Sequence, residues 1–490
     1  MLVKYGKRSS ARNSKLPPGP RKLPLIGNLH NMTGLPHRTL RNLAKKYGPI
    51  MHLQLGEIST VVVSSPRVAQ QIMKTHDLIF ADRPEILASK IMSYNCAGVA
   101  ISRYGDYWRQ LRKIVVLELL SARQVRLFGS LREEEVSNMI QSISLKAGLP
   151  VNISELTSSL SNDVTSRAAF GNKCKDKEVL ISLLQEATSM SGGFAMEDLF
   201  PSIKMLHFIG GVASKLKRMH KRVDKFLTEV IEEHIRNRTT TECSNDGQSE
   251  EDLVDVLLCV QESGELQFPL TMENIKAVIL DTFGAGTDTS AGTTQWAMSE
   301  MMKNHRVMKK VQDEVRRVFN GKKRFCEADI QKLDYLKLVI KETLRLHPSA
   351  PLLLPRESRE RCEIDGFEIP AKTKVIVNAW GLGRDPEYWS DAYTFEPERF
   401  DGNSVDYKGS NFEYIPFGAG RRMCPGMSFS LTVIELALAQ LLYHFDWKLL
   451  EHGKPENLDM TERFGVTLRR KNDLILIPIL MLNDIPFTLP

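Results

Sequence analysis

Apolar positions recur at helical spacing over most of the chain and at strand spacing over only a few short stretches. The longest helical pattern covers 272–302, and others cover 66–76, 106–147 with a break near Ser121, 305–319 and 333–346. The chain lacks the regular alternation of strands and helices that builds a doubly wound sheet. The pattern therefore predicts a mainly α protein with smaller β-sheets, an α+β fold.

The strand patterns are short, and most lie near the two ends of the chain. They are predicted at 50–55, 60–64, 362–369, 374–378, 466–468 and 474–479. The run 238–252 is polar and rich in turn-forming residues, so we expect a surface loop there. No run of 18 apolar residues occurs, and the sequence therefore predicts no membrane-spanning helix.

The positive charge of the chain is concentrated at its beginning. The 490 residues carry a net charge of +7, and residues 1–22 contain seven bases and no acid. The remaining residues are formally neutral, which argues against a nucleic-acid-binding surface on the folded body. The basic head fits contact with anionic lipid, or it simply keeps the terminus soluble. The proline-rich run 16–20 is stiff, so we divide the chain into a head and hinge at 1–22 and one folded domain at 23–490.

The most specific pattern is 416–426, Pro-Phe-Gly-Ala-Gly-Arg-Arg-Met-Cys-Pro-Gly. Its glycines allow a tight loop with inward-facing backbone amides, and its two arginines add positive charge. Both features favour a thiolate over a thiol at Cys424. A lone cysteine is usually a small buried hydrophobe. Here the whole pattern favours presentation of one anionic sulfur to a metal.

This loop resembles the haem-binding loop of the cytochrome P-450 family, the haem-thiolate monooxygenases. Phe417, Gly420, Arg422, Cys424 and Gly426 occupy every defined position of that loop. The resemblance implies that Cys424 is the axial ligand of haem iron and that Arg422 pairs with a haem propionate. It also implies that Phe417 and Gly426 bind the cofactor. The fold that it implies has a long central helix over the haem and the cysteine loop below, within a single catalytic domain.

A second motif, Ala-Gly-Thr-Asp-Thr-Ser at 285–290, falls inside the predicted central helix. Glycine lowers the stability of a helix by about 1 kcal/mol relative to alanine, and hydroxyl side chains weaken the backbone hydrogen bonds of the helix. An acid beside an alcohol can relay protons through water, although a helix kink or a packing notch fits the pattern equally well. The motif is similar to the family's oxygen-activation motif. That similarity implies that Thr289 supports bound oxygen and Asp288 supplies protons.

Several charged and aromatic residues take on a role only through the resemblance. Glu342 and Arg345 are three residues apart on one helix face, where a surface ion pair is worth about 0–1 kcal/mol. The family pattern adds Arg399 and implies a buried structural cluster behind the haem loop. The predicted contacts to the haem propionates, besides Arg422, are Trp108, Arg112 and Arg356.

The resemblance also places a substrate pocket on the side of the haem away from Cys424. The residues expected to line it are apolar or small, as a hydrophobic ligand requires: Cys96, Gly284, Ala285, Leu352, Leu353, Phe464 and Val466. The amino-acid sequences of the motifs are similar to those of plant microsomal enzymes of specialised metabolism, in particular oxidases of terpenoids and indole alkaloids. We therefore expect hydroxylation, desaturation or oxidative rearrangement of such a hydrophobic metabolite.

The implied cofactor is haem b with a cysteine thiolate ligand, and the co-substrate is O2. The resemblance implies that electrons come from NADPH through a partner, NADPH–cytochrome reductase. No Gly-x-Gly-x-x-Gly loop opens a helix in this chain, so we do not expect it to bind NADPH directly. Relatives of this kind begin with an anchor in the endoplasmic reticulum membrane, which this sequence lacks. We expect the parent protein on the cytosolic face of that membrane, and this chain to be soluble or peripheral.

Two alternatives remain open at this stage. A haem-thiolate isomerase or lyase acting on a hydroperoxide would need neither a reductase nor a proton relay. A non-catalytic haem-binding protein would need no substrate pocket. The intact Asp288–Thr289 pair favours the monooxygenase.

Overall fold

The computed structural model describes residues 15–481, apart from 172–181, 184–185, 188–193, 204, 206–210, 242–250, 265, 321, 323–325, 451–452 and 464. Most of the described chain is helical. Its α-helices are α1 (Pro36–Tyr47), α2 (Pro66–Gln70), α3 (Leu87–Met92), α4 (Asp106–Ile114), α5 (Ala122–Leu127), α6 (Gly129–Ser144), α7 (Ile153–Phe170), α9 (Met196–Leu199), α11 (Val212–Thr241), α12 (Leu253–Glu262), α13 (Met272–Lys303), α14 (His305–Phe319), α15 (Glu327–Ile330), α16 (Asp334–Leu346), α17 (Ala379–Leu382) and α18 (Met427–His444).

The strands are short and form small sheets, as the pattern predicts. They are β1 (Ile50–Leu55), β2 (Ile58–Val63), β3 (Val151–Asn152), β4 (Arg356–Glu357), β5 (Cys362–Ile364), β6 (Phe367–Ile369), β7 (Lys374–Val377), β8 (Phe445–Leu449), β9 (Glu462–Arg463), β10 (Arg469–Arg470) and β11 (Ile475–Leu480). The largest sheet has the order β1-β2-β7-β4, in which β2 and β7 are parallel and the other pairs antiparallel. The mainly α fold with smaller sheets is thus confirmed.

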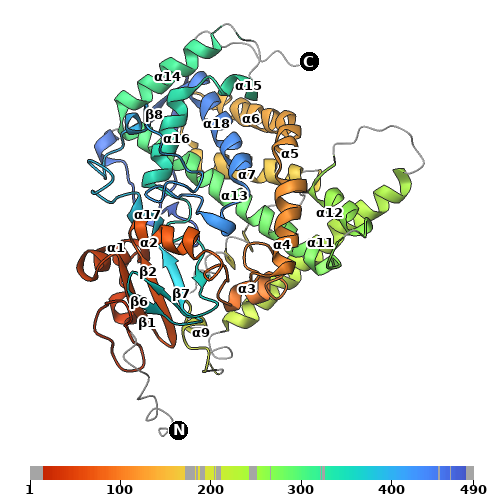
Figure 1. Ribbon diagram of the computed structural model, residues 1–490. Helices are drawn as coiled ribbons and strands as arrows, with labels where there is room; N and C mark the ends of the chain where they lie inside the picture. Colours follow the sequence, from red (N-terminus) through yellow and green to blue (C-terminus); the bar gives the residue numbers. More distant parts are fainter. Residues whose placement is uncertain are drawn as a thin grey trace.

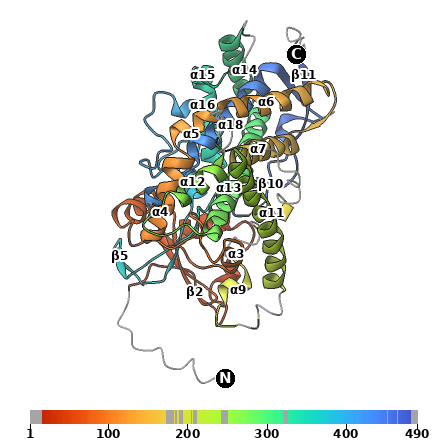
Figure 2. The same cartoon turned by 90° about the vertical axis from the view of Figure 1, so that its right-hand side faces the viewer.

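Helix α13 runs through the middle of the helical part, and the largest sheet lies to one side of it (Figures 1 and 2). It packs along α7 and α18. Gly286 permits the close approach of α7, because a Cβ at this position would lie 3.2 Å from Thr165. On the other side, the hydroxyls of Ser290 and Ser430 are hydrogen-bonded at 2.9 Å. This bond ties the centre of α13 to the first turn of α18, shortly after Cys424.

Helix α18 was not predicted from the pattern, because it is apolar on nearly every face. Its side chains belong to the largest hydrophobic core. Within the described part of the chain, it is the one helix long and apolar enough to span a membrane by length and composition. Most of the helix is buried in the protein, so these features are those of a core helix.

The described part of the proline-rich hinge lies against the sheets. The backbone N–H of His52 donates to the carbonyl of Pro18 at 2.8 Å, and that of Glu368 donates to Lys15 at 2.9 Å. A Cβ on Gly19 would lie 2.1 Å from the carbonyl oxygen of His52. Residues from Lys15 onward are therefore packed on the domain rather than held away from it.

Several predicted boundaries differ from the structure for local reasons. The strand predicted at 362–369 is a hairpin of β5 and β6, because Asp365 and Gly366 turn with φ of 58° and 75°. The strand predicted at 466–468 is wrong, since that stretch bends between β9 and β10. The loop predicted at 238–252 begins later, because α11 extends to Thr241. Residues 242–250 of that loop lie outside the described residues.

Candidate functional site

The segment around Cys424 is a tight loop whose shape depends on glycine. Gly418 and Gly420 have φ of 73° and 67°, in the left-handed region that side chains disfavour. A Cβ on Gly420 would lie 2.1 Å from the carbonyl oxygen of Met73. The N–H of Cys424 donates to the carbonyl of Phe417 at 3.0 Å and closes the loop. The geometry therefore turns the cysteine back toward the body of the protein.

The Cys424 side chain keeps an exposed surface although it lies deep in the fold. Burial raises the pKa of its thiol, while the backbone N–H of Gly426 and the charge of Arg112 lower it. Gly426 itself has open space where a Cβ would be. A sulfur with a free face, an amide donor and a nearby cation is suited to bind a metal as a thiolate.

Two arginines from distant parts of the chain hold this loop through its backbone. Arg112 on α4 donates to the carbonyl of Met423 at 2.6 Å. Arg356 on β4 donates to the carbonyl of Ala419 at 2.8 Å and pairs with Asp77 at 2.7 Å. The structure thus brings two of the predicted propionate contacts onto the cysteine loop.

The third arginine, Arg422, lies within the loop and is stacked 4.2 Å from the ring centroid of Trp108. It donates to the backbone carbonyls of three residues: Ala81, Val99 and Ser102. The indole N–H of Trp108 donates to the same carbonyl of Val99 at 2.9 Å. The predicted partners Trp108 and Arg422 therefore form one contact surface beside Cys424.

These guanidinium groups carry more positive charge than the nearby carboxylates balance. Burial and the charge of Arg356 lower the pKa of Arg422 to about 9. Arg83, which sequence reasoning missed, is 5% exposed, and among the described residues it donates only to backbone carbonyls. Burial, Arg422 and Arg356 lower its pKa well below the ordinary value. A buried excess of positive charge fits a ligand with anionic groups, such as the two carboxylates of haem.

The motif of α13 contributes both a hydroxyl and an acid. Thr289 donates its hydroxyl hydrogen to the carbonyl of Ala285 at 2.8 Å. Asp288 forms an ion pair with Arg469 on β10, which no sequence signal indicated. Ala285 is exposed in the middle of this core helix, and Gly284 has open space where a Cβ would be. A ligand can therefore approach the helix at 284–285, beside the predicted proton relay.

Three of the seven expected pocket residues share one cavity. Leu352, Leu353 and Val466 line one small, partly open cavity. Leu353 also reaches the cysteine loop, because a Cβ on Gly418 would lie 4.0 Å from its side chain. Cys96 is not among the residues that line this cavity, and it lies in a turn with φ of 62°. Phe464 lies outside the described residues.

The cluster predicted behind the loop is present as a buried ion network. Arg345 donates to both carboxylate oxygens of Glu342 at 2.7 Å, and Arg399 donates to one of them at 3.0 Å. Glu342 is fully buried. Breaking such a pair leaves an uncompensated buried charge, so the network makes the fold dependent on all its members.

The comparisons with known proteins agree with this geometry. The family model described as cytochrome P450 matches residues 17–477. The chain belongs to the cytochrome P450 family. Membership and fold imply haem with a cysteine thiolate ligand, and the exposed sulfur and the arginines described above suit that group. This P450 is therefore an oxygen-incorporating monooxygenase of that family.

Its curated relatives include several plant P450s. It is 60% identical to desmethyl-deoxy-podophyllotoxin synthase of Sinopodophyllum hexandrum, over 98% of this chain and 94% of the relative. It is 53% identical to premnaspirodiene oxygenase of Hyoscyamus muticus (97% and 95%) and 52% identical to melianol synthase CYP71BQ17 of Ailanthus altissima (99% and 94%).

A solved zebrafish cytochrome P450 with abiraterone superimposes on this chain with a TM-score of 0.76. The match covers 91% of this chain and 99% of that one at 22% identity. This similarity shows the fold alone, and it confirms the predicted P450 fold.

One further residue of the P450 site, Asp281 on α13, was missed by sequence reasoning. Its carboxylate accepts the backbone N–H of Ala100 at 2.9 Å and also receives that of Val99. A Cβ on Gly98 would lie 2.2 Å from the same carboxylate. Burial raises the pKa of Asp281 to about 6, and the two amide bonds oppose that rise. The acid therefore positions the 97–102 loop against α13, one turn before Ala285. Asp281 lies four residues before Ala285, so the two share one face of the helix, and this spacing could have identified Asp281 from the sequence.

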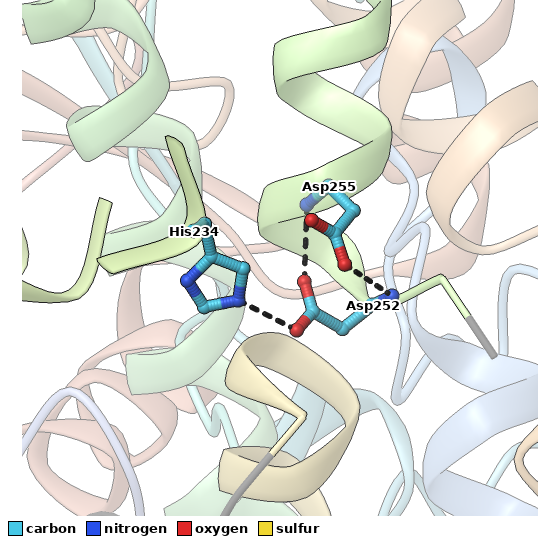
Figure 3. Close-up of side chains that lie close together, drawn as sticks. All are labelled: His234, Asp252 and Asp255. Atoms are coloured by element: carbon cyan, nitrogen blue, oxygen red, sulfur yellow. Dashed lines mark hydrogen bonds and ion pairs between the residues drawn. The ribbon is translucent and has the colours of Figure 1, made fainter. Parts of the chain in front are cut away.

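A different polar cluster, away from the cysteine loop, joins α11 to α12 (Figure 3). His234 contacts Asp252 at 2.8 Å and the carbonyl of Val230 at 2.8 Å. Burial lowers the pKa of His234, but the bond to Asp252 and its charge raise it further, to about 9. Asp252 also caps α12 by accepting from the backbone of Val254 and Asp255. The cluster therefore joins α11 to α12 through the His234–Asp252 ion pair and the Asp252 cap.

The glycine requirement of the cysteine loop can be tested directly. We expect Gly420→Ala to abolish haem binding, because a Cβ there meets the Met73 carbonyl and the φ is strained. Gly402→Ala is the matched control, since Gly402 has φ of 64° but open space around it; we expect a cost of about 1 kcal/mol. Haem content and thermal unfolding measure both. Normal haem loading in Gly420→Ala would contradict the loop geometry.

The role of Asp281 predicts a pH dependence of stability. The pKa of its carboxyl is 3.8 ordinarily and about 6 in the fold, so the folded protein binds more protons between these values. Stability therefore falls as pH rises from 5 to 7, by about 1 kcal/mol from this group. We expect the free energy of unfolding of the wild type to fall by that amount relative to Asp281→Asn. Parallel pH profiles for the two proteins would show that Asp281 is not desolvated as described.

Proposed function

We propose that this P450 oxidises a hydrophobic, terpenoid-like plant metabolite, with Cys424 as the thiolate ligand of haem iron. The observation that carries the proposal is the exposed Cys424 sulfur, which has the Gly426 amide and Arg112 beside it and lies close to the first turn of α18. The Ser290–Ser430 bond joins that turn to the centre of α13, where Ala285 is exposed. On this proposal residues 23–490 form one catalytic domain.

When bound, the haem supplies the activation of O2 that side chains cannot provide. The protein residues would hold and surround it. Arg112, Arg356 and Arg422 would bind the propionate carboxylates through charge-assisted hydrogen bonds, and Trp108 would hold Arg422 by stacking. Phe417 and Gly426 would form the loop surface beneath the ring, where Gly426 leaves room for it.

Thr289 and Asp288 would hold and move protons beside the exposed part of α13 at Ala285. The Thr289 hydroxyl, which donates to the Ala285 carbonyl, would exchange that bond for one to a ligand bound there. Asp288 would pass protons inward from solvent, and its pairing with Arg469 would keep the carboxylate oriented. Arg469 is thus a positioning residue in the relay, because it acts through Asp288.

The substrate class rests on the pocket and on the relatives. The cavity at Leu352, Leu353 and Val466 is lined mainly by apolar side chains, which suits a hydrocarbon skeleton. The names premnaspirodiene oxygenase and melianol synthase indicate terpenoid-like substrates for those relatives. We therefore propose a terpenoid in preference to an indole alkaloid, and Cys96, Gly284, Ala285 and Phe464 as further pocket residues.

The electron source and the cellular location follow from the same relationship. We propose that NADPH–cytochrome reductase delivers two electrons per turnover, so that one oxygen atom enters the product and the other leaves as water. Plant P450s of this type are microsomal, and we propose the cytosolic face of the endoplasmic reticulum membrane for the parent protein. The seven bases of residues 1–22 would then lie next to anionic lipid.

The proposed function is tested by product analysis with isotopically labelled oxygen. Incubation of haem-loaded protein with reductase, NADPH, 18O2 and a panel of terpenoids should give a product that carries one 18O atom. We expect Thr289→Ala to lower the product formed per NADPH by at least about tenfold. Thr432→Ala is the matched control, because Thr432 is equally half-buried and makes the same bond to a carbonyl four residues earlier, but on α18 instead of α13.

Two results would contradict the proposal. NADPH-independent conversion of a hydroperoxide, with no 18O from O2 in the product, would favour the isomerase or lyase. If Thr289→Ala formed as much product per NADPH as the wild type, Thr289 would have no role in the proton relay.

A further inference from the structure

A buried acid from the first part of the chain lies against the cysteine loop. Asp77, which follows α2 and the π-helical turn 71–75, is 7% exposed. One of its carboxylate oxygens accepts the backbone N–H of Arg421 at 2.8 Å, and the other accepts an N–H of the Arg356 guanidinium at 2.7 Å. Among the described residues, Asp77 is the one acid that hydrogen-bonds the 416–426 loop.

The bond to Arg421 supplies a cap that the loop does not provide for itself. Residues Gly420–Arg422 form a 3-10 turn, and the residue before this turn is Ala419, whose side chain has no acceptor. The first N–H groups of such a turn carry partial positive charge and have no partner within it, so a carboxylate beside them is stabilising. Asp77 therefore fixes the turn that directly precedes Met423 and Cys424.

The loop is also shaped to admit this carboxylate. A Cβ on Gly420 would lie 2.9 Å from the carboxyl carbon of Asp77 and from one of its oxygens. The turn 71–75 packs against the turn 420–422. The close approach thus depends on a glycine on one side and on the buried acid on the other.

The same carboxylate orients the guanidinium of Arg356. One of its terminal nitrogens donates to Asp77, and the other donates to the carbonyl of Ala419 at 2.8 Å. Burial lowers the pKa of Arg356, and the charge and hydrogen bond of Asp77 oppose that fall. Because a guanidinium is planar and rigid, two fixed acceptors also fix the directions of its remaining N–H groups. Asp77 would therefore set the direction in which Arg356 meets a haem propionate.

We propose that Asp77 is a positioning residue of the haem site, whose carboxylate holds the Arg421 backbone and the Arg356 side chain in the arrangement that retains haem. The inference rests on the part of the proposed function that assigns Cys424 to haem iron, and it is independent of the substrate. Asp77 acts through Arg356 and the cysteine loop. Its removal therefore weakens haem retention although every predicted haem contact is still present.

Two other roles of Asp77 would give different results. An acid that competes with the propionates for Arg356 would weaken haem binding, so its removal would slow haem loss. An acid that serves only the stability of the fold would affect haem loss no more than an equally destabilising change elsewhere in the core.

The test measures the rate of haem transfer from haem-loaded protein to an excess of apomyoglobin. Asp77→Ala removes both bonds, whereas Asp77→Asn keeps an oxygen that can accept from Arg421 and removes the charge that pairs with Arg356. We expect Asp77→Ala to lose haem at least about tenfold faster than the wild type, because hydrogen bonds to charged groups are strong enough for that factor. Asp77→Asn should lie between the two. The share of haem with the red-shifted Soret band, in the reduced protein with carbon monoxide, should also fall in Asp77→Ala.

Two control variants separate this role from a general effect on the fold. Asp446→Asn removes another acid that pairs with an arginine, Arg316 at 2.8 Å, on β8. Val311→Ala opens a cavity at a fully buried position of α14 and so destabilises the core. We expect both variants to lose haem within about twofold of the wild-type rate.

Unchanged or slower haem loss in Asp77→Ala would overturn the proposal, and so would equal rates in Asp77→Ala and Val311→Ala. If Asp77→Ala fails to load haem, Asp77→Asn is compared with Asp446→Asn, and equal rates in these two overturn it. Haem transfer needs no turnover, so its outcome is separate from that of the proposed function. A wild type without the red-shifted band would contradict ligation by Cys424, whereas a normal band with unchanged haem loss in Asp77→Ala would contradict the role of Asp77 alone.

Discussion

The cysteine loop is held by hydrogen bonds from arginines to its backbone carbonyls, and the rest of the site depends on this constraint. Arg112 and Arg356 reach the loop from α4 and β4, and Arg422 extends outward from it to the segment before α4. Carbonyl acceptors orient these guanidinium groups without neutralising them, and of the three only Arg356 has a carboxylate partner, Asp77, among the described residues. The loop is therefore fixed in shape and prepared for an anionic ligand, which is the physical reason that a haem with two carboxylates suits it.

The helix opposite the loop shows the complementary arrangement. In α13, Gly286 lets α7 pack closely, and Gly284 and Ala285 leave the helix accessible to a ligand. One turn earlier, Asp281 fixes the 97–102 loop, whose Val99 carbonyl also accepts from Trp108. A continuous series of polar contacts thus connects α13 with the arginines around Cys424. Both faces of the cofactor site are set by the same few backbone segments.

The sequence predicted the mainly α fold, the bounds of α13 nearly to the residue and the loop of Cys424, because motif spacing and helical periodicity are local properties. It missed α18, since a helix buried on all sides has no polar face to give a period. It also missed the contact of Asp288 with Arg469 and the burial of Arg83 and Lys374, since each depends on segments far apart in the chain. Asp281 was within reach of the sequence, because it lies on the same helix face as Ala285.

Ligation of haem iron by the Cys424 thiolate is tested most directly by the absorption spectrum of the reduced protein with carbon monoxide. We expect a strongly red-shifted Soret band in haem-loaded wild type. Cys424→Ser should lose that band, and Cys362→Ser, which changes a thiol in the small β5–β6 hairpin, should keep it. A haem-loaded wild type without the red-shifted band, or a Cys424→Ser variant that retains it, would contradict ligation by Cys424.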